Sequence, residues 1–275
     1  MNGTGPRILG NIPPVLKNLL IINILMFIGS MVVERTMQVD LNNLLGLHYF
    51  KSEFFRPYQI ITHMFMHANL THIFLNMFML WMFGRVLEQV WGGRRFLFYY
   101  FFTGLGAAAL HMLVMHIELS ALVRDATAFS NTPSPDLFAA FIKEHLGRST
   151  FPQLHDFTQA WLADPSNSSY SNEALSFINK FVQSKMNIST VGASGAVYGV
   201  LLAFGMIFPN MPLVLIFFPF FPIKAKYMVI AMGVLELVYG LSMPGSNVAH
   251  FAHLGGMIFG FILIKYWNTN RRNFY

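Results

Sequence analysis

Two short motifs carry side chains that could form a nucleophile and its base. Gly-Ala-Ser194-Gly opens a hydrophobic stretch that ends at Phe208, and another apolar stretch carries Ala-His253-Leu-Gly-Gly. A serine hydroxyl becomes a nucleophile when an adjacent base takes its proton, and histidine is the commonest base. Each residue alone also fits a structural role, because Ser and His join helices by hydrogen bonds in membranes. Together they predict a serine hydrolase working inside the bilayer, if the two side chains meet.

Matched glycines give the two stretches a reason to touch. Gly195 and Gly199 are four residues apart on one predicted helix, and Gly256 and Gly260 are four apart on the other. Small residues at this spacing let helix backbones approach closely in a membrane. We therefore expect the two glycine faces to pack together, with the serine and the histidine at similar shallow depths.

A third motif could supply hydrogen-bond donors. His72 and Asn76 are four residues apart, so they share one face at the start of a predicted helix. Both side chains offer N–H groups, as an oxyanion hole requires. A hydrogen-bond cluster between helices is the alternative interpretation of the same pair.

Metal and carboxylate chemistry can be weighed in the same way. His63 and His67 have the spacing of paired metal ligands, but no Glu accompanies them as in H-E-x-x-H, so we expect no metal and no cofactor. All aspartates fall outside the predicted spans, which excludes a two-aspartate protease and an intramembrane Asp behind the histidine. A Ser-His dyad remains. Glu236 is the single acid inside a predicted span, where it could be a transporter's proton relay or a structural residue bonded to a neighbour.

The composition is that of a membrane protein. The 275 residues are 55% hydrophobic and 11% charged, with a mean hydropathy of +0.49, whereas soluble domains carry about 25% charged residues. The absence of cysteine excludes disulfides and thiol catalysis. We expect the first apolar segment to be a retained helix rather than a signal peptide. Six segments approach the length of about 20 residues that spans hydrocarbon: 15–33, 68–84, 95–117, 193–209, 226–243 and 249–267.

The distribution of charge predicts the orientation. Basic residues gather in the N-terminal segment, the 85–95 loop, Lys224, Lys226 and the C-terminal tail, where Glu88 is the one acid. By the positive-inside rule, we expect both termini to be cytoplasmic, in a multi-pass protein of the cell (inner) membrane. The net charge of +6 reflects this asymmetry and does not indicate nucleic acid as a partner.

The connections are unequal in character. Residues 34–66 form an apolar first loop that we expect to be amphipathic and to lie at the interface. Residues 118–187 read as an extracytoplasmic insertion of short amphipathic helices, one starting at Ser134-Pro135 and another near Ser171. Residues 211–221 are too short and too proline-rich for a span, so we interpret them as a re-entrant or interfacial connection. The whole chain, 1–275, is then one membrane domain containing the insertion.

Taken in order, these motifs resemble the rhomboid intramembrane serine proteases. Two departures are a Phe-Arg pair where the family commonly has Trp-Arg, and an insertion longer than the family's usual connection. The matching motifs cover most of the chain outside the insertion: Phe55-Arg56, His67-x4-His72-x3-Asn76, Gly84-Arg85-x2-Glu88-x3-Gly92, Gly192-Ala-Ser194-Gly-x2-Tyr198 and Ala252-His253-x-Gly-Gly256-x3-Gly260.

The resemblance implies a fold and a catalytic site. The fold would be an all-α, six-helix membrane bundle with a water-filled cavity open to the extracytoplasmic side and the insertion between helices three and four. Ser194 would be the nucleophile and His253 the general base and later acid. His72, Asn76 and the backbone N–H of Ser194 would form the oxyanion hole.

It also implies supporting residues and partners. Tyr198 would pack against the His253 ring and orient it, and Gly192 would allow the tight backbone beside the oxyanion hole. The substrates would be single-span membrane proteins in the lipid bilayer, cut near the extracytoplasmic end of the span, with no metal or nucleic acid involved. The alternative function is that of a non-catalytic rhomboid-like protein that binds transmembrane segments.

Overall fold

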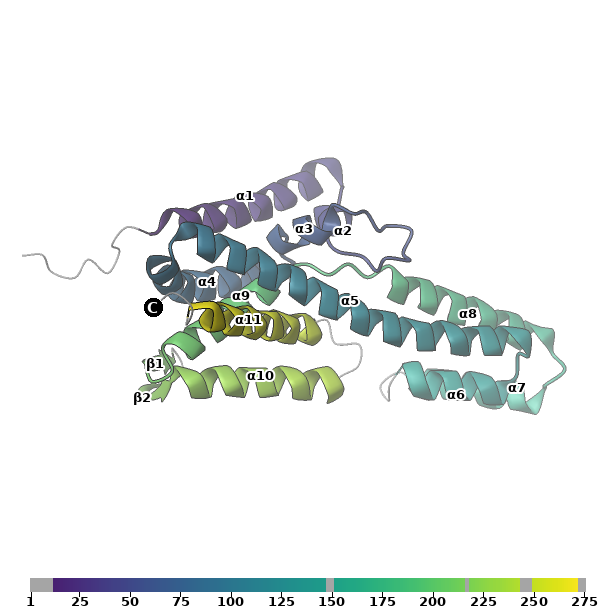
Figure 1. Cartoon of the computed structure of the whole chain (residues 1–275). Coiled ribbons are helices and arrows are strands. Elements are labelled where there is room, and N and C mark those ends of the chain that lie inside the picture. Colours follow the sequence, from purple (N-terminus) through teal and green to yellow (C-terminus); the bar gives the residue numbers. More distant parts are fainter. Residues whose placement is uncertain (1–11, 147–150, 216–217, 243–248, 272–275) are drawn as a thin grey trace, which may run out of the picture. The chain divides into compact units, whose positions relative to one another are not determined.

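A computed structural model describes residues 12–146, 151–215, 218–242 and 249–271 (Figure 1). The terminal segments 1–11 and 272–275, whose cytoplasmic placement the charges predict, lie outside these residues. The elements in chain order are α1 (Pro14–Met37), α2 (Leu41–Leu45), α3 (Gln59–Thr62), the 3-10 helix η1 (His63–Phe65), α4 (Leu70–Trp91), α5 (Gly93–Asn131), α6 (Pro135–His145), α7 (Phe151–Ala163), α8 (Ser168–Met186), α9 (Ser194–Ile207), β1 (Pro212–Leu215), β2 (Phe218–Lys224), α10 (Ala225–Ser242) and α11 (His250–Arg271).

The chain divides into two compact units. The bundle unit contains Met1–Leu47, Arg56–His111 and Ser189–Tyr275, and the insert unit contains His48–Phe55 and Met112–Ile188. The helix α5 runs through both. Each unit has its own buried apolar cluster.

The all-α membrane class and the six-helix bundle predicted from the sequence are confirmed. Within the described residues, α1, α4, α5 and α10 are long and apolar enough to cross a membrane. The helix α9 is apolar but has only 14 residues. With α11, these helices correspond one for one to the six predicted segments. They bring α9 against α4, α10 and α11 in the interior of the bundle unit.

The end of the third span differs from the prediction, and the connection at 211–221 has a form that the prediction did not specify. The third span was predicted to end at 117, but α5 continues to Asn131 because no Pro or Gly interrupts residues 107–131. Charges end the apolar run there without ending the helix. The connection at 211–221, predicted to be too short and proline-rich for a span, is part of an antiparallel strand pair, with Pro212 opposite Lys224 and Leu213 opposite Ile223.

A buried carboxylate caps the N-terminus of α1. Glu88, near the end of α4, accepts hydrogen bonds from the backbone N–H groups of Val15 (3.0 Å) and Leu16 (2.7 Å). The first N–H groups of a helix have no partner within the helix and carry partial positive charge, so a carboxylate there satisfies both needs. Glu88 thereby joins α4 to α1.

The helices α9 and α11 touch backbone to backbone at one glycine pair. A Cβ placed on Gly256 would lie 1.8 Å from the carbonyl oxygen of Gly195, and a Cβ on Gly195 would lie 2.4 Å from the Cβ of Ala107 in α5. No side chain fits in either place. The predicted close approach is therefore confirmed at this crossing.

The other two glycines of the predicted faces have a different partner. A Cβ on Gly199 would meet the side chain of Thr103, and one on Gly260 would meet the hydroxyl of Tyr99 at 2.3 Å. Both partners belong to α5, and the Tyr99 hydroxyl donates to the Gly199 carbonyl oxygen at 2.8 Å. The two glycine faces therefore pack directly on each other at Gly195 and Gly256, whereas at Gly199 and Gly260 they pack on side chains of α5.

The insert unit is built on aromatic packing. Ser134 caps α6 by accepting from the Leu137 N–H at 3.2 Å, as its place before Pro135 predicted. The helix α6 is amphipathic as predicted: Phe138, Phe141 and Ile142 are buried, whereas Leu137 is 39% exposed. The second predicted helix, α8, begins at Ser168, three residues early. The buried side chains of the unit include Phe129, Phe138, Phe141, Trp161 and Ile178.

Candidate active site

Ser194 and His253 lie within hydrogen-bonding distance. Ser194 is the first residue of α9 and His253 lies in the first turn of α11. The Oγ of Ser194 is 2.8 Å from the Nε2 of His253. The close crossing of α9 and α11 places two residues that are 59 positions apart in sequence in direct contact. This is the geometry that transfer of a hydroxyl proton to an imidazole requires.

Tyr198 holds the histidine ring from one face. It lies one turn after Ser194 in α9, and its ring stacks on that of His253 with centroids 4.2 Å apart and planes 4° from parallel. Its hydroxyl donates a short hydrogen bond to Oε1 of Glu236. Stacking and this bond restrict rotation of the imidazole.

The far side of the imidazole faces a carboxylate. Oε1 of Glu236 is 3.0 Å from Nδ1 of His253, and Oε2 is 2.6 Å from Nδ1 of His250. The first contact is at ion-pair distance but is not aligned as a hydrogen bond. The Glu236 side chain is only 10% exposed. The predicted dyad had no carboxylate behind the histidine, and Glu236 of α10 occupies that place.

Gly192 leaves room for the His72 ring on the side of the backbone that faces Ser194 Oγ. Gly192 has a φ of +130°, a region that side chains strongly disfavour. The position a methyl would take there is 2.8 Å from Nε2 of His72 and 3.6 Å from Oγ of Ser194. The Ala68 N–H lies 3.4 Å from Nδ1 of His72 and donates to it. Since Nδ1 accepts, the neutral ring carries its proton on Nε2, as a donor beside the serine.

Backbone hydrogen bonds fix the segment that leads into α9. Leu47 and Thr190 exchange two bonds of 2.8 Å, and the N–H of Gly192 donates to the His63 carbonyl oxygen at 2.9 Å. The first loop therefore positions the residues just before Ser194. Its apolar sequence had suggested only an interfacial location, because strand pairing of a single residue leaves no pattern in the sequence.

Asn76 is held in place by a hydrogen bond to the backbone of His72. It is 5% exposed, and its Nδ2 donates to the His72 carbonyl oxygen at 2.9 Å. An amide nitrogen has two protons, so one is left for another acceptor. The structure thus brings His72 beside Gly192 and Ser194, and ties Asn76 to the same turn of α4.

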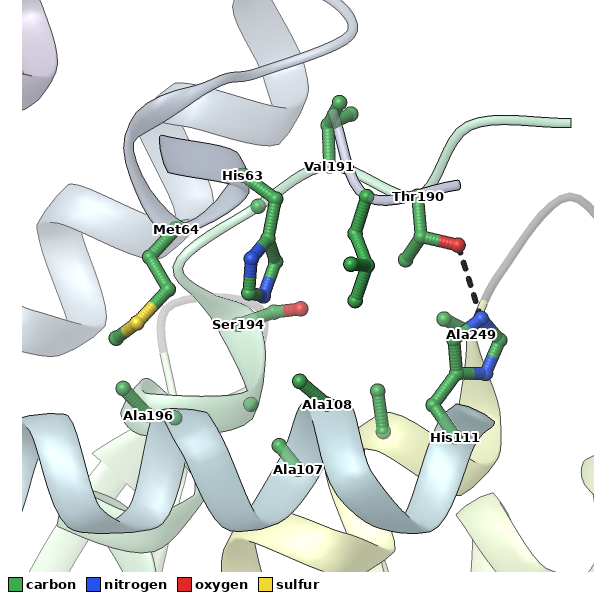
Figure 2. Close-up of a pocket in the computed structure, with 15 residues that line it drawn as sticks. His63, Met64, Ala107, Ala108, His111, Thr190, Val191, Ser194, Ala196 and Ala249 are labelled. Carbon is green, nitrogen blue, oxygen red and sulfur yellow. Dashed lines mark hydrogen bonds between the residues drawn. The ribbon is translucent and has the colours of Figure 1, made fainter. Parts of the chain in front are cut away.

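A small cavity opens beside Ser194 (Figure 2). Much of its wall is formed by small side chains, including Ala107, Ala108 and Ala196. His111 lies at its edge and hydrogen-bonds through Nε2 to the Thr190 hydroxyl at 2.9 Å. A cavity of this kind accepts a small apolar group next to the serine.

The predicted His63 and His67 pair does not form a metal cluster among the described residues. His63 Nδ1 bonds to the Gln59 carbonyl oxygen at 2.8 Å. Burial, and secondarily the charge that His72 can carry, lower the pKa of His67 to about 4. His67 is therefore neutral near pH 7, and its ring packs edge-on against His72 at 5.1 Å. A different group, Glu236 with His250 and His253, has ligand atoms within 4.8 Å of one another.

The chain is similar to known proteins. Residues 55–121 and 167–268 match the Rhomboid domain family. A stretch of 58 residues is 40% identical to Rhomboid-like protein 11, chloroplastic, of Arabidopsis thaliana, and spans 21% of each protein. The family match covers more than half of the chain and includes Ser194, His253, His72 and Asn76. The chain belongs to the rhomboid family.

Proposed function

We propose that this rhomboid-family membrane protein is an intramembrane serine endopeptidase. The observation that carries the proposal is the 2.8 Å contact between the Oγ of Ser194 and the Nε2 of His253. In a buried setting such a pair satisfies its own polar groups, and it is also the minimal unit for activating a hydroxyl. The cavity beside it supplies room for a reacting group.

Acylation would begin with attack of the Ser194 Oγ on a substrate carbonyl carbon. The new C–O bond forms as the hydroxyl proton moves to Nε2 of His253, and the carbonyl oxygen becomes an oxyanion. The C–N bond then breaks, and the imidazolium gives its proton to the leaving amine. The product is an acyl-Ser194 ester with neutral His253.

The oxyanion would be held by donors on α4 and α9. The supporting observations are the Nε2 proton of His72 beside Gly192, the second amide proton of Asn76, and the N–H of Ser194 at the start of a helix. Water then attacks the ester, His253 takes its proton, and the same proton returns to the Ser194 Oγ as the acid leaves. This step restores the enzyme.

The substrate class follows from family and cavity. Rhomboid relatives act on membrane proteins, so we infer a single-span substrate cut near the extracytoplasmic end of its span. The alanines that line the cavity favour a small residue before the cut. Both termini would lie in the cytoplasm and the site would open on the other side of the cell membrane.

A serine-directed fluorophosphonate tests the proposal without knowledge of the natural substrate. We expect wild type in detergent to be labelled once per chain, with labelling lost in Ser194→Ala and His253→Ala. A single-span peptide with alanine before the cut should be cleaved in proteoliposomes by wild type only. Absence of both reactions in folded wild type would instead identify a non-catalytic member of the family.

A further inference from the structure

The carboxylate of Glu236 is placed where a structural role alone does not explain it. A carboxylate inside a membrane helix is costly unless it is paired. Glu236 is 8% exposed, and three polar groups converge on it: the hydroxyl of Tyr198 and the Nδ1 atoms of His250 and His253. One of these belongs to the histidine that touches Ser194. The three groups come from α9 and α11, whereas Glu236 belongs to α10.

We propose that Glu236 is the third member of the catalytic group, a positioning carboxylate that acts through His253. The proposal rests on the function proposed above. Ser194 lies 2.8 Å from one ring nitrogen of His253, and Oε1 of Glu236 lies 3.0 Å from the other. A carboxylate at Nδ1 selects the tautomer with its proton on Nδ1, which leaves the Nε2 lone pair for the serine proton. It also stabilises the imidazolium formed after transfer.

Two neighbours hold the carboxylate in place. The Tyr198 hydroxyl donates to the same oxygen that faces His253, and Nδ1 of His250 lies 2.6 Å from the other oxygen. Both oxygens are therefore oriented, and the ring of His253 is fixed between Tyr198 and Glu236. The Nδ1 contact of His253 is loosely aligned at rest, as catalytic hydrogen bonds often are before substrate binds.

A shared metal ion is the competing arrangement for these residues. Ligand atoms around a tetrahedral Zn²⁺ with bonds of 2.0–2.1 Å are separated by about 3.3 Å. The Glu236 oxygens lie 2.6 Å and 3.0 Å from the two histidine nitrogens, which are distances for sharing a proton. Nε2 of His253, the other metal-binding atom of that ring, already contacts Ser194.

The test compares three residues at one position with a second buried glutamate. The variants are Glu236→Gln, Glu236→Asp and, as the matched control, Glu88→Gln, which removes a 4%-exposed carboxylate far from Ser194 in sequence. The fluorophosphonate rate is resolved into its maximal rate and half-saturating concentration, and the single-span peptide gives kcat and KM. Thermal midpoints report folding, and elemental analysis reports bound metal.

We expect Glu236→Gln to lower kcat and the maximal labelling rate by about 10²-fold or more, with KM and half-saturation unchanged. Glu236→Asp restores the charge and should recover at least part of that loss. Glu88→Gln should lower the thermal midpoint with kcat per folded molecule unchanged.

A merely structural Glu236 gives the opposite order. The Gln side chain keeps the size and most hydrogen bonds of Glu, so it would then be the better replacement, and Asp the worse. Near-wild-type kcat in Glu236→Gln would overturn the proposal, as would one zinc per chain whose removal by dipicolinate abolishes labelling. Either result leaves the serine assignment standing, since only the absence of labelling in untreated wild type removes that assignment.

Discussion

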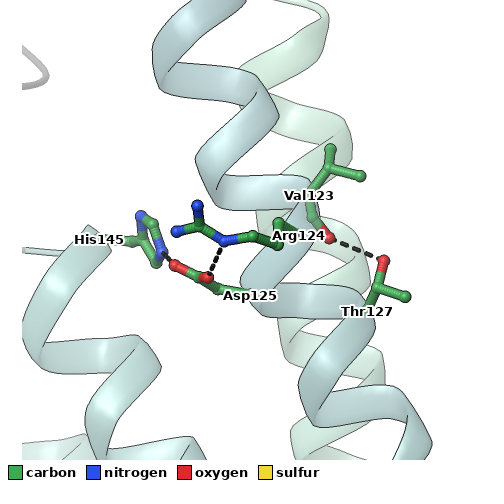
Figure 3. A network of polar contacts seen from close by, with 5 residues as sticks. All are labelled: Val123, Arg124, Asp125, Thr127 and His145. Carbon is green, nitrogen blue, oxygen red and sulfur yellow. Dashed lines mark hydrogen bonds and ion pairs between the residues drawn. The ribbon is translucent and has the colours of Figure 1, made fainter.

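Each unit of the molecule pairs a carboxylate with histidine, and the two pairs differ in their surroundings. In the insert unit, Oδ2 of Asp125 lies 2.9 Å from Nε2 of His145, and Arg124 binds the other oxygen at 3.0 Å (Figure 3). The Asp125 and Arg124 side chains are 31% and 74% exposed. In the bundle unit, Glu236 and its two histidines are each about 10% exposed.

Asp125 and His145 form an exposed ion pair, whereas Glu236 and its histidines belong to the buried candidate site. Arg124 and solvent already stabilise the charge on Asp125, so the Asp125–His145 pair is stable without a reacting group beside it. Glu236 instead faces two histidines and the Tyr198 hydroxyl, and the second nitrogen of one histidine meets the Ser194 hydroxyl. A carboxylate and a histidine indicate chemistry only where burial and a third polar group accompany them.

Removing one histidine from each pair tests this difference most strongly. We expect His253→Ala to reduce labelling and peptide cleavage by at least about 10⁴-fold, because no base remains for the serine. His145→Ala should leave both rates unchanged. Substantial activity in folded His253→Ala, measured by labelling, would remove the distinction between the pairs.

The oxyanion donors should show the next largest effect. Asn76→Ala is expected to lower kcat by about 10²–10³-fold, the usual loss for one donor, and to be milder than loss of the base. The matched control is Asn23→Ala in α1, since Asn23 is also buried and also donates to the carbonyl four residues earlier, at 2.7 Å. It should change thermal stability alone. Equal kinetic loss in both variants would contradict the assignment of Asn76.

Glu88 is a buried carboxylate whose hydrogen-bond donors are backbone N–H groups of α1 and not histidines. Glu88→Gln keeps one acceptor for α1 but leaves a buried N–H facing an amide, so we expect stability to fall by about 1–3 kcal/mol. The measurement is the midpoint of thermal unfolding in detergent, with Glu88→Asp alongside. An unchanged midpoint would show that water satisfies the start of α1.

The smallest effect is expected at the exposed pair. Asp125→Asn should change stability by less than about 1 kcal/mol, because exposed ion pairs contribute little. Its catalytic rates should match those of wild type. A large loss of activity here would mean that the exposed pair is coupled to the reaction, and the contrast between the two units would fail.

Much of the fold was predictable because it follows from composition and spacing. The apolar segments located all six bundle helices, and the Ser134-Pro135 pair located the start of α6. Helix ends were less predictable. Hydrophobicity marks where lipid contact stops, whereas α5 continues until its backbone bonds are interrupted after Asn131.

The site was predictable only in part. Ser194, His253 and His72 lie in motifs, so their types and spacing were visible. Glu236 lies in no motif, and its meaning depends on which way α10 faces α11, a rotation that a single apolar segment does not encode. Its presence as the one acid in a predicted span was the available signal, which fitted either a proton relay or a bond to a neighbour and did not identify His253 as that neighbour.

The crossing at Gly256 also bears on how the sequence can change. Even the smallest substitution there, to alanine, would place a methyl group 1.8 Å from the Gly195 oxygen. Every larger residue would clash in the same way. Mutations that change the distance between Ser194 and His253 must therefore occur at other positions. A library randomised at residue 256 and sorted for fluorophosphonate labelling should therefore return glycine alone, whereas a library at an exposed position of α11 such as Ile262 should return many residues.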